Sequence, residues 1–400
     1  MAFETYNADR WPNPIRSGPQ GHGGKQRFSP KELQRRLELV QQSLREQDAD
    51  LLLIQGWFPA ATAGVHTSVY WITGDNSYRN TVTVIVPPKG AIAVVEGTKQ
   101  FHNPGDQCPY CSGEDLRPYL QGAKRIAYDG LGYLGHQFYQ FINQCCPGVE
   151  LVEFGPLLGK LKAIKSEEEL DLIRDSSQIH NKIYQAAPLL LQPGKTLYQI
   201  SLEIQEILGR LGADLSMMYK VYVGATPNAP LCTDSAGPDR QADPMHVLCP
   251  DDFVTLGLET PGSGGYYAQG ERYFFFRKPH PEIQAFYQAA KELYGYEATL
   301  YQPHLSRENF RCAIEDFDIS VLGKPAKASG GPCWGLGMLT VDRPNFLADW
   351  ETLGLEPGIA FLNDAMVVQE GKGLRLSDMC IMTQQGPEFP CPYPMELTIL

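Results

Sequence analysis

Residues 251–277 read DDFVTLGLETPGSGGYYAQGERYFFFR and have the pattern of a β-hairpin. Residues 253–258 predict one strand and residues 266–276 predict an aromatic return strand, with a turn rich in Pro and Gly between them. Side chains two positions apart share one face of a strand, so Glu271 lies in an apolar, aromatic run. A carboxylate buried in such surroundings needs a partner. The hairpin therefore predicts one wall of a functional site, while Arg272 on the opposite face predicts a structural ion pair.

The composition limits the classes of protein to which the chain can belong. Its 400 residues are 43% hydrophobic, which is enough for one large or two ordinary domains. The net charge of −12 argues against a nucleic acid or an acidic membrane as partner. The sequence has neither a run of about 18 apolar residues nor a basic-then-apolar leader, so we expect a cytoplasmic protein without a membrane partner.

The ten cysteines come without a secretory pattern and are therefore expected to be reduced thiols. Cys108 and Cys111 form a CPYC motif, and the adjacent Cys145 and Cys146 are conceivable partners for it. Four such sulfur atoms would suit a structural zinc ion. A vicinal pair supplies two separated ligands poorly, so free thiols are the favoured interpretation and zinc is the alternative.

Composition and periodicity divide the chain into three parts. Residues 1–27 are rich in Pro, Gly, Asn and Arg and predict an extended arm, which could wrap a partner subunit. In residues 28–157, short apolar strands alternate with helices, as in an α/β layer sandwich. Residues 158–400 predict an α+β domain in which paired long helices cover antiparallel hairpins.

Four stretches of the sequence, taken together and in their order along the chain, resemble the creatinase and Xaa-Pro peptidase superfamily over about residues 30–390. The resemblance implies that residues 158–400 form the pita-bread catalytic domain of that superfamily, after an α/β N-terminal domain. The stretches are LKAIKSEEELDLIR (161–174), YVGATPNAP (222–230), LEPGIAFLNDAMVV (355–368) and LRLSDMCIMT (374–383).

The peptidases of this superfamily hold two metal ions with two Asp, one His and two Glu, because hard divalent cations need several anionic oxygens. The residues at the matching positions carry too little negative charge for two such ions, so the resemblance implies no metal and no cofactor here. These positions hold Gly257 (with Glu259 two residues on), Gln269, Cys333, Asp364 and Ser377.

Within the superfamily, GYYAQGER (265–272) resembles the metal-independent creatinase branch, in which the matching Glu binds substrate. A guanidinium or ammonium group prefers an anionic, partly desolvated partner such as Glu271. The resemblance places Glu271 in a catalytic role and assigns substrate binding to further residues around it. These substrate-binding residues are Tyr267, Gln269, Asp364, Ser377 and Cys232.

The creatinase branch uses a His as general acid–base, for which a pKa near neutrality is needed. His246 is slightly favoured for this role, and Cys333 is the alternative as a proton carrier or nucleophile. Tyr78 and Arg79 match residues that enter the neighbouring subunit's site and receive the substrate carboxylate. The resemblance therefore implies a homodimer with an active site that crosses the subunits.

These inferences lead to a metal-independent, creatinase-like enzyme acting on a C–N bond of a small carboxylated amine, amide or guanidino compound. Hydrolysis is the favoured chemistry, and rearrangement or elimination across the same bond are alternatives to it. Two other functions stay open: an Xaa-Pro-type metallopeptidase, and a catalytically silent pita-bread protein that binds a ligand.

Overall fold

The computed structural model describes residues 28–56, 67–74, 82–96, 116–215, 219–231, 243–262, 264–339 and 341–400. The chain divides into two compact units between Lys162 and Ala163. The expected boundary at residue 157 falls inside helix α5 (Gly155–Ala163), and the expected arm, residues 1–27, lies outside the described residues. In the part of the chain that the structure describes, no helix is both long and apolar enough to span a bilayer.

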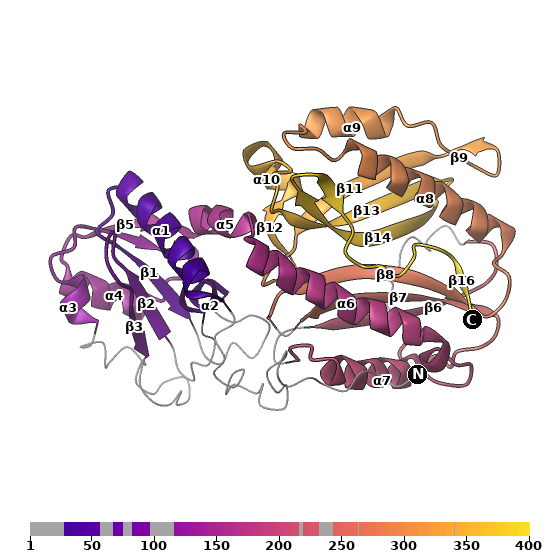
Figure 1. Ribbon diagram of the computed structural model, residues 1–400, viewed down its shortest axis with the longest axis horizontal. Helices are drawn as coiled ribbons and strands as arrows, with labels where there is room; N and C mark the ends of the chain where they lie inside the picture. The colour runs from indigo at the N-terminus through magenta and orange to yellow at the C-terminus, as the bar shows by residue number, and fades with distance from the viewer. Residues whose placement is uncertain are drawn as a thin grey trace. The chain divides into compact units, whose positions relative to one another are not determined.

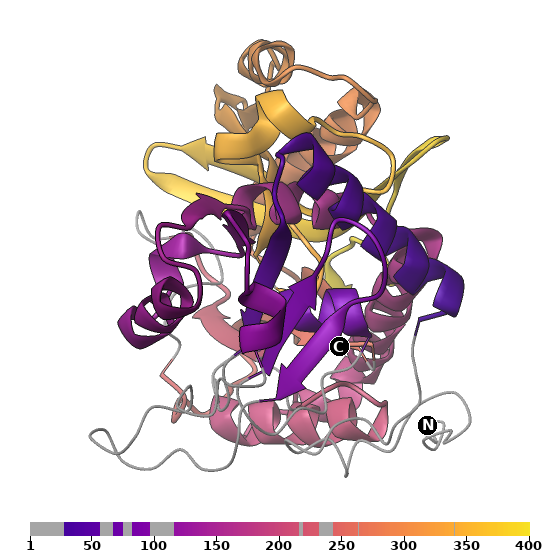
Figure 2. The same cartoon turned by 90° about the vertical axis from the view of Figure 1, so that its left-hand side faces the viewer.

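The N-terminal unit is an α/β layer structure (Figures 1 and 2). Its sheet has the strand order β3-β2-β1-β4-β5, in which β1 pairs antiparallel with β2 and parallel with β4. Leu53, Ile126 and Phe138 share one buried cluster on the side of α3 and α4. The elements are α1 (Pro30–Glu46), β1 (Leu51–Gly56), α2 (Thr67–Thr73), β2 (Val82–Val86), β3 (Ala93–Glu96), α3 (Arg117–Leu120), β4 (Arg125–Tyr128), η3 (Leu131–Tyr133), α4 (His136–Cys145) and β5 (Glu150–Glu153).

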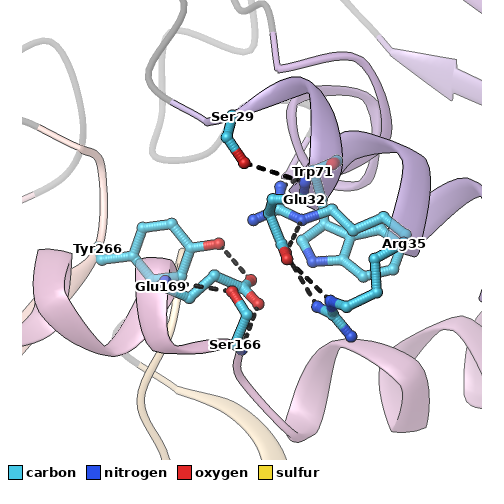
Figure 3. Close-up of polar contacts among 8 residues, drawn as sticks. Ser29, Glu32, Arg35, Trp71, Ser166, Glu169 and Tyr266 are labelled. Carbon is cyan, nitrogen blue, oxygen red and sulfur yellow. Dashed lines mark hydrogen bonds and ion pairs between the residues drawn. The ribbon is translucent and has the colours of Figure 1, made fainter.

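Helix α1 begins at a serine cap. The Ser29 side chain accepts a hydrogen bond from the backbone N–H of Glu32, three residues on, and thereby caps the helix (Figure 3). Glu32 in turn pairs with Arg35 and with the buried Arg36. The cap and these pairs satisfy polar groups at the first turn of the helix.

The C-terminal unit contains, among its described residues, a nine-stranded sheet. Seven strands follow the order β12-β11-β13-β14-β8-β7-β6, and the other two pair with interior strands, β15 with β14 and β16 with β8. The strands are β6 (Lys220–Pro227), β7 (Asp252–Pro261), β8 (Tyr267–Phe275), β11 (Lys327–Gly335), β12 (Asp342–Asn345), β13 (Ala360–Gln369), β14 (Lys372–Thr383), β15 (Gly386–Glu388) and β16 (Thr398–Ile399), and β9 (Ser320–Val321) pairs with β10 (Lys324–Pro325) apart from the sheet. The helices are α6 (Glu167–Leu190), α7 (Leu197–Arg210), α8 (Pro281–Leu300), α9 (Arg307–Glu315) and α10 (Phe346–Leu353).

Two helix pairs cover the two halves of this sheet (Figure 1). Helices α6 and α7 pack on β6, β7 and β8 through a cluster that includes Ile183, Ile204 and Leu256. Helices α8 and α9 pack on β11, β13 and β14 through a second cluster, to which Phe286 and Phe361 belong. Each such side chain contributes about 1.5–3 kcal/mol on full burial, so each cluster holds its helix pair on its own half of the sheet.

The predicted hairpin is present as β7 and β8. Its register pairs Gly257 with Glu271 and Glu259 with Gln269. The two halves of the sheet meet at β8 and β14, where Gly270 pairs with Asp378. A Cβ atom at Gly270 would lie 2.9 Å from an Asp378 carboxylate oxygen, so a larger residue there would have to shift that side chain. Arg272 forms the expected buried ion pair, with Asp378 at 2.7 Å.

Candidate functional site

The hairpin, β14 and β6 line a small, partly open cavity with an inner volume of about 30 Å³. The residues that line it come from strands far apart in the sequence, brought together by the sheet order. They are Tyr222, Gly257, Leu258, Glu259, Gln269, Gly270, Glu271, Arg375 and Ser377.

Three buried carboxylates lie in or beside this cavity. Glu259, Glu271 and Asp364 are 9%, 3% and 8% exposed. Glu259 accepts a hydrogen bond from the Gln269 amide at 2.8 Å and pairs with Lys220 at 3.2 Å. Burial of carboxylates is costly unless cations or donors face them, and Glu259 has both.

The side-chain amide of Gln269 is held in a fixed orientation. Its nitrogen donates to Glu259, and its oxygen accepts from the indole N–H of Trp334 at 3.1 Å. The amide therefore presents a neutral dipole at a position that the resemblance matches to a metal-binding carboxylate of the peptidases.

Asp364 on β13 lies opposite Ser377 on β14, and the Ser377 hydroxyl donates a hydrogen bond to it. The Cys333 thiol donates to the other oxygen of Asp364, with sulfur and oxygen 3.2 Å apart. Burial, followed by the charge of Asp364, raises the pKa of Cys333 far above its usual range. Cys333 is therefore a protonated hydrogen-bond donor, which is a poor nucleophile.

Arg375 on β14 was not among the predicted site residues. Its guanidinium nitrogens lie 3.6 Å from a Glu271 oxygen and 3.7 Å from an Asp364 oxygen. The signal for it was present in the sequence, because Arg375 precedes Ser377 by two residues and so shares its face of the strand.

His246 lies away from the cavity. Its ring bonds the carboxylate of Asp252 at 2.8 Å, at the start of β7. Five residues of strand separate Asp252 from Gly257, which is about 16 Å at 3.3 Å per residue. Burial alone would raise the pKa of Asp252, but hydrogen bonds from His246 and Cys249 outweigh it and hold that pKa below its usual value. The structure thus pairs His246 with a carboxylate outside the site, and the proton-carrying role expected of it is not supported there.

The other predicted residues have different placements. Tyr267 is buried, and its backbone N–H donates to the Gly337 carbonyl at 2.8 Å, but the cavity lining does not include it. Tyr78, Arg79, Cys232, Cys108 and Cys111 lie outside the described residues. Cys145 and Cys146 are free thiols.

Comparison with known proteins identifies the family. The profile of "Metallopeptidase family M24" matches residues 171–384, more than half of the chain. The chain belongs to family M24. Among curated relatives, the "Probable dipeptidase PepE" of Mycobacterium bovis is 23% identical over 250 residues, 61% of this chain and 62% of that protein. The match thus spans about three fifths of the length of this relative. The "Uncharacterized peptidase YqhT" of Bacillus subtilis is 21% identical, over 70% of this chain and 76% of its own.

Solved structures agree on the M24 fold. Dipeptidase PepE from Mycobacterium ulcerans superposes with a TM-score of 0.67 at 17% identity, covering 93% of this chain and 99% of that one. The prolidase from Pyrococcus horikoshii superposes with a TM-score of 0.66 at 15% identity, covering 91% of this chain and 99% of that one. These likenesses confirm the predicted α/β N-terminal domain and pita-bread C-terminal domain. They do not show the creatinase-like, metal-independent subtype, and the peptidase alternative agrees better with the names of these relatives.

The donor set of this M24 protein does not fit a pair of divalent metal ions. Gly257, Gln269 and Ser377 supply no anionic oxygen at three of the five matched positions, and Cys333 keeps its proton. Within the described ranges, no group of three or more His, Cys, Asp or Glu side chains is arranged to hold a metal. Only Asp364 keeps a carboxylate, and Ser377, Cys333 and Arg375 already surround it.

Proposed function

We propose that this chain is a hydrolase that cleaves the amide C–N bond of a small, carboxylated substrate, with dipeptides as the first class to test. Membership of family M24 and the dipeptidase names of its relatives support peptide-bond hydrolysis. The observation that carries the proposal is the cluster of Glu271, Asp364 and Arg375 at the cavity, where buried charged groups converge on a small space.

In the proposed reaction Glu271 acts as the general base. It accepts a proton from a water molecule while the water oxygen adds to the amide carbonyl carbon, and the proton then passes to the leaving nitrogen as the C–N bond breaks. Arg375 lies beside Glu271 and would stabilise negative charge on the carbonyl oxygen. Gln269 and Asp364 would bind the amino end of the substrate.

The carboxylate end of the substrate is assigned to Tyr78 and Arg79 of a neighbouring subunit, as the resemblance implies. This assignment makes the enzyme a homodimer, and the small molecule is its expected partner. A cytoplasmic location stays a prediction from composition.

A panel of dipeptides, including Xaa-Pro peptides, together with creatine and small carboxylated amides tests the function. We expect release of free amino acids from at least one dipeptide. The Glu271→Gln variant should lose about 10²–10⁴-fold in rate, because the amide cannot accept the proton. Glu203→Gln is the matched control, since Glu203 also pairs with a cation, Lys195, but at the surface and outside the cavity. Equal rates for both variants would contradict the assignment of Glu271.

The metal-independent, creatinase-like enzyme is the second candidate, and the replaced ligands Gly257, Gln269 and Ser377 favour it. The same panel separates the two, because turnover of creatine or another guanidino compound, with no cleavage of any dipeptide, would support this candidate. Rates measured after exhaustive chelation then show whether the reaction needs a metal.

A catalytically silent protein that binds a ligand is the third candidate. A thermal-shift screen of small amino acids, guanidines and amides detects binding independently of turnover. Ligands that raise the melting temperature but are recovered unchanged after long incubation would support this candidate over both enzymes.

A further inference from the structure

Arg375 occupies a central place among the site strands. In the sheet order, its strand β14 lies between β13, which carries Asp364, and β8, which carries Glu271. The two terminal nitrogens of its guanidinium face different carboxylates, Glu271 at 3.6 Å and Asp364 at 3.7 Å. One side chain therefore faces two acidic groups from the strand that separates them.

Burial makes this arrangement energetically significant. The side chains of Glu271 and Asp364 are 3% and 11% exposed, and that of Arg375 is 21% exposed. Two buried carboxylates that lie beside the same guanidinium have lost much of their hydration, which is costly. A positive charge that reaches both offsets these costs, and the planar guanidinium can direct separate N–H groups at each of them.

The other buried carboxylate of the site has a cation of its own. Glu259 pairs with Lys220 across β6 and β7 at 3.2 Å. Among the described residues, Glu259 and the pair of Glu271 and Asp364 thus each have a cation supplied by the chain itself. A divalent ion entering the cavity would meet the positive charge of the guanidinium beside the two carboxylates that it would need as ligands.

We propose that Arg375 is the resident cation of this site and that its guanidinium takes the place of the divalent ions bound by M24 metallopeptidases. The inference concerns the charge balance of the folded site, so it holds whichever substrate is bound. It can fail while the proposed hydrolysis stands, and the reverse is also true, because its tests measure metal content and stability rather than turnover.

The first test uses the wild-type protein. After treatment with chelator and gel filtration, the protein is incubated separately with Mn²⁺, Co²⁺ and Zn²⁺, desalted, and its metal content is measured by mass spectrometry. We expect far less than one equivalent of each ion. Retention of one or two equivalents, lost when Asp364 is replaced by Ala, would overturn the proposal.

The second test removes the guanidinium and returns it as a small molecule. Arg375→Ala should melt several degrees below wild type, because two buried carboxylates lose their cation. Millimolar methylguanidinium should raise the melting temperature of this variant in a saturable manner and leave wild type unchanged. Methylurea, a neutral molecule of similar shape, should have no effect on either protein.

Arg174→Ala is the matched control variant. Arg174 is 28% exposed and contacts Glu388 with two nitrogens at 2.9 Å, but it lies outside the cavity. Rescue of Arg375→Ala and not of Arg174→Ala supports the resident cation. Equal response of the two variants, or no response of a folded Arg375→Ala protein, overturns it. If Arg375→Ala does not fold, metal retention by wild type decides the question.

Discussion

His180 shows how one buried residue ties the stability of the pita-bread unit to pH. Its ring lies on α6, is completely enclosed, and bonds the Thr260 hydroxyl at 2.8 Å. Burial, with a smaller effect from the charge of Arg272, lowers the pKa of His180 to about 3. The unfolded chain binds a proton at this residue below about pH 6.5, and the folded protein does not until about pH 3.

We therefore expect the free energy of unfolding to fall as pH decreases from about 6.5 to 3, with His180 contributing up to about 1.4 kcal/mol per pH unit. His180→Gln keeps a partner for Thr260 but cannot be protonated, so its unfolding free energy should depend less steeply on pH in this range. Urea unfolding at a series of pH values measures both slopes. Identical slopes for wild type and variant would show that His180 is not buried as a neutral ring.

At the scale of elements, the start of α6 is fixed by a reciprocal cap. Ser166 accepts from the backbone of Glu169, and the Glu169 side chain accepts from the backbone of Ser166 (Figure 3). The Tyr266 hydroxyl also donates to Glu169, at 2.5 Å. The cap thereby connects the first turn of α6 to the residue that precedes β8, so the position of the helix and that of the hairpin depend on each other.

Removing the Tyr266 hydroxyl should destabilise the pita-bread unit. Tyr266→Phe deletes a buried hydrogen bond to a carboxylate, for which we expect a loss of about 1.5–3 kcal/mol in unfolding free energy. Tyr133→Phe is the control, because Tyr133 is 85% exposed and should change stability by less than about 0.5 kcal/mol. Denaturant titration of both variants measures the difference.

The elements themselves were largely predictable from sequence, and the site was only partly so. Period-two alternation placed Glu271 in the hairpin, and a serine followed three residues later by a glutamate, as at Ser29 and Ser166, is a sequence pattern typical of a helix start. Arg375 was missed because matching a family pattern directs attention to the ligand positions themselves. Its role depends on β14 lying between β8 and β13, and that strand order follows from packing between segments distant in sequence.

His246 illustrates the opposite error. As a histidine shortly before the hairpin it matched the order expected of a catalytic residue, but order along the chain does not measure distance. The turn that ends at Asp252 brings His246 to the start of β7, whereas the cavity begins at Gly257 further along the same strand. A side chain cannot bridge about 16 Å, and this separation of His246 from the cavity is visible only in the folded strand, not in the sequence.

At the scale of the C-terminal unit, the sheet depends on the close approach of β8 and β14. Gly270→Ala would place a methyl group 2.9 Å from the Asp378 carboxylate, which also holds Arg272. We expect a destabilisation of about 1–3 kcal/mol. Gly295→Ala is the control, since a Cβ atom there would meet nothing within 4 Å. Thermal unfolding measures the stability of both variants. A Gly270→Ala protein as stable as wild type would contradict a close contact between the added methyl group and the Asp378 carboxylate.

The expected homodimer can be tested on the whole molecule. Light scattering should give about twice the chain mass of 44.5 kDa. Arg79→Ala and Glu271→Gln variants, each inactive alone, should regain about a quarter of wild-type activity after mixing and subunit exchange, because half of the random dimers then contain one intact site. A monomeric mass, or no recovery despite exchange, would contradict a site shared between subunits.

The placement of Arg375 between two carboxylates has a consequence for the dependence of the protein on cellular metal ions. An enzyme whose site needs bound metal ions must compete for them, can bind the wrong ion, and loses activity when the required ion is depleted. A cation encoded in the chain is present as soon as folding ends, in fixed stoichiometry and without a delivery system. Such a protein would keep the same charge balance in metal-starved and metal-rich cells alike.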